Sequence, residues 1–331
     1  GEAMGEIWVS RHFPPANKEI MDGLVRSLLD AYEQALTHCE WMGEETRAQA
    51  LKKLSTFTPK IGYPDQWIDY SSLHFDSDSL VATVEAATRF HVQRRWDKLG
   101  GPVDRSEWHM TPQTVNAYYD PTMNEIVFPA AILQAPFFDP DADDASNFGA
   151  IGAVIGHEIG HGFDDQGSRF DAEGNLENWW TEEDRERFEE RTKRLVDQYD
   201  ALTPRDLQGE EPPLHVNGAL TLGENIGDLA GLSIAWQAYV ARLAHKGLTP
   251  QSAPEIDGQS AAQRFFTAWA RGWRTAIRRE YAKQLLSIDP HSPAEFRCNQ
   301  IVANMDPFAE AYDVAPGDTL WIAPEERVRI W

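Results

Sequence analysis

The feature of this sequence that most constrains its fold is a set of ionisable residues inside an apolar stretch. Residues 148–162 are mainly aliphatic side chains, alanine and glycine, which is typical of a buried helix. Within them lies the run His-Glu-Ile-Gly-His at 157–161. Four residues are about one helical turn, so His157 and His161 share a face, and Glu158 lies about 100° further round. The spacing predicts a metal site with an acid beside it, and the alternative is a chance match.

A second pair of acids stands in another apolar segment. Glu224 and Asp228 are one turn apart, and their neighbours are mostly aliphatic residues and glycine. Burying two carboxylates costs several kcal/mol unless a cation meets them. A catalytic zinc site needs a third protein ligand and an open fourth position. We therefore expect Glu224 to be the third ligand and Asp228 to orient a ligand imidazole. A solvated acidic face is the alternative, which the apolar neighbours disfavour.

Charge and composition exclude several classes of partner. The chain has 30 Lys and Arg against 53 Asp and Glu, a net charge of −23. Such a field repels phosphate and anionic lipid, so we expect neither nucleic-acid nor membrane-surface binding. Cys39 and Cys298 form at most one bridge, which favours a reducing compartment such as a bacterial cytoplasm over an extracellular location. The start at Gly1 is expected to be artificial or processed, and the end natural.

Apolar periodicity predicts a mostly helical α+β protein in two parts. Residues 1–100 are expected to be a helical segment, and residues 101–331 a catalytic domain with a small β-sheet. The predicted helices cover residues 17–41, 44–54, 79–99, from about 147, 182–199, 223–243, 260–286 and from 293, the last with Ser292 as its N-cap. The β-branched and aromatic runs 114–119 and 125–128 predict a hairpin, whose open edge is suited to pairing with an extended peptide. An ordinary surface hairpin is the alternative.

These motifs together resemble the neprilysin family of zinc metallopeptidases. The residues that carry the resemblance are 157–165, 223–228, Asn-Ala-Tyr-Tyr at 116–119, His-Ser-Pro at 291–293 and, in the manner of soluble actinobacterial members, 124–133. The resemblance covers the chain from about Met4 to Trp331. It implies a thermolysin-like gluzincin fold that binds one zinc through His157, His161 and Glu224. It also implies that Glu158 is the general base and acid.

The resemblance assigns further residues to the substrate. It implies that His291 stabilises the oxyanion and Arg297 holds the substrate carbonyl, and that Asn116 and Ala117 bind the peptide backbone. Asp164 is expected to orient a ligand, with Asp165 as a competitor. The apolar pocket is expected to be lined by Ile132, Phe137, Val154 and Trp273, which implies an endopeptidase that cleaves oligopeptides before hydrophobic residues.

Family members are longer, because an N-terminal helical half forms most of a lid over the zinc. Residues 1–100 are expected to be the end of that lid and its return to the catalytic domain. An apolar stripe is expected to face the N-terminal half or a complementing chain, and it comprises Ile20, Leu24, Leu28, Leu29 and Tyr32. One alternative is a half that binds peptides without cleaving them. Another is a zinc aminopeptidase, although no Gly-x-Met-Glu-Asn lies near the hairpin.

Overall fold

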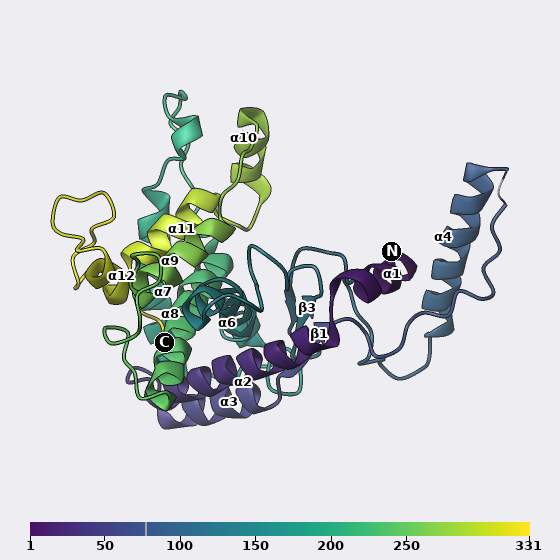
Figure 1. Ribbon diagram of the computed structural model, residues 1–331, viewed down its shortest axis with the longest axis horizontal. Helices are drawn as coiled ribbons and strands as arrows, with labels where there is room; N and C mark the ends of the chain where they lie inside the picture. The colour runs from purple at the N-terminus through teal and green to yellow at the C-terminus, as the bar shows by residue number, and fades with distance from the viewer. Residues whose placement is uncertain (77) are drawn as a thin grey trace.

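The structure is a computed structural model that describes residues 1–76 and 78–331. It is mostly helical with one small sheet, which confirms the expected fold class (Figure 1). The helices are α1 (Glu2–His12), α2 (Pro15–Thr37), α3 (Glu44–Ser55), α4 (Leu80–Asp97), α5 (Asp144–Asn147), α6 (Ala153–Gly160), α7 (Glu182–Asp200), α8 (Leu222–His245), α9 (Ala261–Gly272), α10 (Arg279–Ile288), α11 (Ala294–Ala303) and α12 (Asp306–Ala311). Within the described residues, none of the helices is both long and apolar enough to span a membrane.

The sheet combines strands from both predicted parts of the chain, residues 1–100 and residues 101–331. Its order is β1 (Thr58–Gly62), β3 (Glu125–Pro129), β2 (Tyr118–Asp120), with β1 parallel and β2 antiparallel to β3. The expectation that residues 1–100 are entirely helical is therefore wrong at β1. Pro59 suggested a loop there, but an edge strand tolerates proline because one row of its N–H groups needs no partner. The hairpin is confirmed, although its first strand is shorter than residues 114–119.

Helices α6 and α8 cross at the centre of the molecule, and glycines set their distance. A Cβ on Gly156 would lie 2.7 Å from the carbonyl oxygen of Gly231, and one on Gly231 would lie 2.5 Å from the backbone nitrogen of His157. Larger residues would push the two helices apart. The close approach brings the start of α8 next to the histidines at the end of α6.

Helix α2 packs against this pair, which corrects one expectation. Leu24, Leu28 and Tyr32 are buried, and the Tyr32 hydroxyl donates a 2.7 Å hydrogen bond to the Gly156 carbonyl of α6. The apolar stripe of α2 is therefore covered by the chain itself, and only Ile20 of that set is exposed. The stripe was assigned to a partner because the sequence does not show which helices fold onto it.

Helix α4 differs, since none of its 18 residues, all of them described, is buried. It lies beyond α1 at one end of the longest axis (Figure 1). Its exposed large apolar side chains are Leu80, Val81, Val84 and Trp96.

Two predicted helix boundaries are wrong. The segment 260–286 is not one helix, because α9 ends at Gly272 and α10 starts at Arg279. The N-cap of α11 is Pro293, not Ser292. The Ser292 hydroxyl instead donates to the Asn225 side chain of α8 at 2.7 Å, a tertiary contact that local sequence does not reveal.

Candidate metal centre and catalytic cavity

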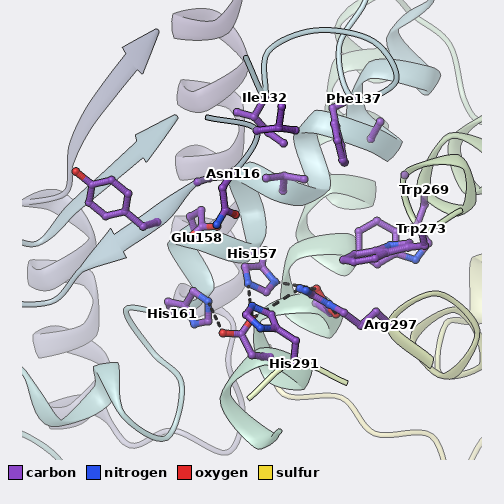
Figure 2. Close-up of a pocket in the computed structure, with 18 of the residues that line it drawn as sticks. Asn116, Ile132, Phe137, His157, Glu158, His161, Trp269, Trp273, His291 and Arg297 are labelled. Carbon is purple, nitrogen blue, oxygen red and sulfur yellow. Dashed lines mark hydrogen bonds and ion pairs between the residues drawn. The ribbon is translucent and has the colours of Figure 1, made fainter. Parts of the chain in front are cut away.

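Two helices bring three metal-binding side chains together. A π-helical turn (Phe148–Gly152) leads into α6, whose last turn carries His157 and is followed at once by His161. Glu224 comes from the first turn of α8. One ligand atom from each residue lies within 4.8 Å of those of the other two, and Figure 2 shows both imidazoles turned toward one point. The predicted ligand set is thus assembled by the fold.

Asp228, one turn beyond Glu224, fixes the ring of His157. Its Oδ1 lies 2.8 Å from His157 Nδ1. Because an ionised carboxylate only accepts, Nδ1 carries the proton and Nε2 keeps its lone pair for a metal. The same carboxylate accepts from Arg297 Nε at 2.7 Å and from its terminal nitrogen at 2.8 Å. One buried acid therefore orients a ligand imidazole and a guanidinium.

Asp164 performs the matching function for His161. Its Oδ2 lies 2.7 Å from His161 Nδ1, while Oδ1 accepts from the backbone nitrogens of Gln166 and Gly167. Asp165 bonds to the Gln166 amide instead. Of the two acids that the sequence left open, the structure places Asp164 on the imidazole.

The donor set fits zinc. The Nε2 atoms of His157 and His161 lie 3.2 and 3.7 Å from oxygens of Glu224, close to the roughly 3.4 Å between ligands of a tetrahedral zinc. Among the described residues, the buried Oε2 of Glu224 accepts no hydrogen bond of good geometry. Two imidazoles and a carboxylate suit zinc chemically. The family-implied metal is thus compatible with the residues present.

The electrostatics of the cluster also favour positive charge. Burial opposes charging His157, yet its hydrogen bond to Asp228 and the nearby carboxylate of Glu224 raise the pKa of the imidazole to about 10. Burial alone would raise the pKa of Glu224, but the imidazoles of His157 and His291 hold that pKa well below its ordinary value. The carboxylates therefore stabilise positive charge at this point, whether it is carried by protons or by a metal ion.

Glu158 lies beside the three ligands and is only 6% exposed. Burial raises the pKa of its carboxyl group, against the attraction of His157 and His161. A carboxylate with a raised pKa is a better proton acceptor, which is what a general base requires. Glu158 and the ligands border the same cavity (Figure 2).

That cavity has a volume of about 420 Å³, which suits a side chain and its adjoining backbone. All six predicted substrate-binding residues line it: Asn116, Ala117, Ile132, Phe137, Val154 and Trp273. Asn116 and Ala117 directly precede β2, which is one of the two edge strands of the sheet. Trp269 also lines the cavity and was not predicted, because a tryptophan in a helix is usually core.

His291 and Arg297 complete the cavity. His291 Nε2 lies 3.2 Å from Glu224 Oε2, and its Nδ1 lies 2.7 Å from Asp289 Oδ1. The Arg297 guanidinium stacks on Trp273, 4.2 Å from the ring centroid. Asp289 was missed in the sequence, although its position two residues before His291 offered a signal for an orienting acid.

Comparison with known proteins gives a consistent result. A model of "Peptidase family M13" matches residues 116–328, and an N-terminal model of that family matches residues 1–64. The chain is 37% identical to a neutral endopeptidase of Lactococcus lactis subsp. lactis and 34% identical to neprilysin-3 of Drosophila melanogaster. It covers 49% and 42% of their lengths, and each alignment includes the whole chain.

Solved structures agree. The Mycobacterium tuberculosis zinc metalloprotease Zmp1 in complex with an inhibitor is 55% identical, with a TM-score of 0.94 over the whole chain and 49% of the Zmp1 chain. The structure of PepO from a Lactobacillus is 35% identical, with a TM-score of 0.87, and 49% of it is covered. The chain therefore spans about half the length of the relatives it matches.

Proposed function

The chain belongs to peptidase family M13, and we propose that it is a zinc-dependent endopeptidase acting on oligopeptides. The single observation that carries this proposal is the arrangement of His157, His161 and Glu224 around one point with the buried Glu158 beside them. All four side chains face a cavity large enough for a peptide side chain. The chain spans about half the length of its relatives, so the endopeptidase activity is proposed for the chain and for the whole protein alike.

The metal would be held by His157, His161 and Glu224, one zinc per chain. When bound, zinc supplies Lewis acidity, which polarises a carbonyl and lowers the pKa of water. Glu158 accepts a proton from the attacking water and later returns it to the leaving amine. The raised pKa of the Glu158 carboxyl group suits both steps.

The substrate would be positioned by groups on both sides of the cavity. Asn116 and Ala117 bind the peptide backbone next to the β2 edge. Arg297 and His291 donate hydrogen bonds to the carbonyl oxygen as it gains negative charge, and charge-assisted bonds are stronger there than neutral ones. Asp228 holds the Arg297 guanidinium in place beforehand. Ile132, Phe137, Val154 and Trp273 accept a hydrophobic side chain, which places cleavage before such residues.

We propose further that the longer protein supplies the cover of this cavity. The support is the exposure of α4, whose apolar side chains face solvent in the described chain, and the half-length match to relatives. The free thiols Cys39 and Cys298 agree with a reducing compartment, and an extracellular location is the alternative. The physiological peptide is set by the cover as well as by the cavity.

The decisive experiment substitutes Glu158 by Gln. The amide keeps the shape of the side chain but cannot accept a proton, so we expect cleavage of a quenched-fluorescence peptide to fall by about 10² to 10⁴ while zinc content is unchanged. His161→Ala is the matched variant, which should lose zinc as well. Cleavage by Glu158→Gln within tenfold of the parent, or full zinc retention by His161→Ala, would contradict the proposal.

A further inference from the structure

Lys53, in the last turn of α3, is a buried cation that the mechanism above does not use. It is 1% exposed. Its Nζ donates to the carbonyls of Gly162, Gly167 and Phe170 at 2.7, 2.7 and 2.8 Å. All three acceptors belong to the loop that follows His161. A helix near the start of the chain therefore holds the loop next to the metal site.

The surroundings of Lys53 are suited to a charged amine. The faces of Tyr119, Phe163 and Trp179 have their centroids 5.8 to 5.9 Å from Nζ. Burial lowers the pKa of Lys53 to about 7, and the negative charge of Asp164 raises it. Three carbonyl acceptors require three N–H donors, which the ammonium has and the neutral amine lacks.

The loop held by Lys53 is the one that places Asp164. Its N–H groups at Gln166 and Gly167 point to Asp164 Oδ1, while its carbonyls at Gly162, Gly167 and Phe170 point to Lys53. The loop also folds tightly onto the ligand, since a Cβ on Gly167 would lie 1.7 Å from the carbonyl oxygen of His161. The loop 162–170 is thus held between the Asp164 carboxylate and the Lys53 ammonium group.

We propose that Lys53 is a positioning residue of the metal centre: it holds the loop 162–170 so that Asp164 keeps the His161 imidazole aimed at the zinc. This inference rests on the proposed zinc site. An apolar side chain of similar length would fill the same space without the cost of burying a charge. What such a side chain lacks is the ability to hold three carbonyls.

The test is zinc affinity, measured by competition with a chromophoric chelator on the metal-free chain, for Lys53→Met and the parent. Loss of groups that orient a ligand typically costs 10- to 100-fold in metal affinity, and we expect a loss in that range. The absorption bands of the Co²⁺-loaded chain should shift as well, because they report ligand geometry. A purely structural role of Lys53 would lower the melting temperature and leave both readouts unchanged.

Lys60→Met is the matched control. Lys60 comes from the same segment and is largely buried, but it contacts Glu125 at 2.6 Å and the Glu107 carbonyl at 2.8 Å rather than the loop. Its loss should leave zinc affinity unchanged. The effects of Lys53→Met and Asp164→Asn should not add, because both act on the same imidazole. If Lys53→Met folds poorly, Lys53→Gln, which keeps two N–H donors, replaces it.

Three results would count against the inference. If the Lys53 variant matched the parent in zinc affinity and in its Co²⁺ spectrum, the inference about Lys53 would be overturned and the proposed zinc site would stand. Full additivity with Asp164→Asn would show that Lys53 acts elsewhere and would overturn it too. A parent chain that binds zinc no better than His161→Ala would overturn the proposed function, and this inference with it.

Discussion

Helices α2 and α4 both belong to the first hundred residues, yet they have opposite environments. Seven of the 23 residues of α2 are buried against α6, α8 and their surroundings. None of the 18 residues of α4 is buried, although Leu80, Val84 and Trp96 are large and apolar. The boundary between the part packed on the catalytic domain and the exposed part therefore lies within residues 1–100. Helix α2 is part of the catalytic unit, and α4 exposes a face that the described chain does not cover.

The difference indicates which properties this chain contains. The proposed metal ligands and the proposed base lie on or next to helices that bury one another, so the described chain itself brings them to the cavity. An isolated helix of this length is marginal in water unless packing supports it. If the part that covers α4 also covers the cavity, as proposed above, it would help to select the peptides that enter.

The largest effect is expected from removing side chains on the two helices in turn. Leu28→Ala in α2 deletes a fully buried side chain and should lower the free energy of unfolding by about 2 to 5 kcal/mol. Val84→Ala in α4, where the valine is 55% exposed, should change it by less than about 0.5 kcal/mol. Urea unfolding followed by circular dichroism measures both. Equal losses of stability for the two variants would show that α2 and α4 do not differ in burial.

The next prediction concerns the proposed cover of α4. In the chain alone, amides of α4 should exchange rapidly with deuterium, because few tertiary contacts protect them. Adding the proposed N-terminal half should slow exchange in residues 80–97 by at least about tenfold and leave residues 15–37 of α2 unchanged. Hydrogen exchange with mass spectrometry gives both values. Strong protection of α4 in the isolated chain would show that it needs no cover.

The sequence predicted the site better than it predicted the packing around it. The metal ligands follow from a helical spacing and from paired acids one turn apart, both of which are local patterns. The fold class follows from apolar periodicity in the same way. The roles of His291 and Arg297 came from resemblance to a family, which carries information that one sequence lacks.

The errors share a physical cause. Strand β1 was missed because Pro59 suggests a loop, and only pairing with β3 makes the segment a strand. The apolar stripe of α2 predicts a docking face, because the sequence does not show that α6 and α8 pack against it. The sequence does not reveal the role of Lys53, because its partners are backbone carbonyls more than one hundred residues away and every residue has a backbone carbonyl.

A smaller effect is expected from two glycines, one inside the buried layer and one outside it. Gly231→Ala places a methyl group 2.5 Å from the His157 nitrogen, so α6 and α8 must move, at a cost of about 1 to 3 kcal/mol. Gly23→Ala on the outer face of α2 meets no atom of the described residues within 4 Å and should stabilise the chain by about 0.5 to 1 kcal/mol. Thermal unfolding distinguishes the signs. A stabilising Gly231→Ala would mean that the helices are not in close contact.

The smallest effect concerns the junction that ties the N-terminal segment to the catalytic unit. Asp184 at the start of α7 is buried and accepts hydrogen bonds from the Gly43 nitrogen at 2.9 Å and the Thr181 hydroxyl at 2.9 Å. Burial opposes its ionisation, but hydrogen bonds from Thr46, Gly43 and Thr181 and the charge of Arg187 lower its pKa below the ordinary 3.8. We therefore expect Asp184→Asn to cost about 1 to 2 kcal/mol at neutral pH.

The pH dependence of that cost identifies its origin. A carboxyl group whose pKa is lower in the folded state binds fewer protons there than in the unfolded state, so its contribution to stability is complete above pH 3.8 and is lost as the pH falls through the folded pKa. The gap between parent and Asp184→Asn in urea unfolding should narrow below about pH 4. Asp197 lies on the exposed face of α7 and pairs with Lys193 at 2.8 Å, so Asp197→Asn should cost less than about 0.5 kcal/mol. A gap that stays constant down to pH 2.5 would mean that the shape of Asp184, and not its charge, fastens α3 to α7, and the strength of that junction would then be independent of acid.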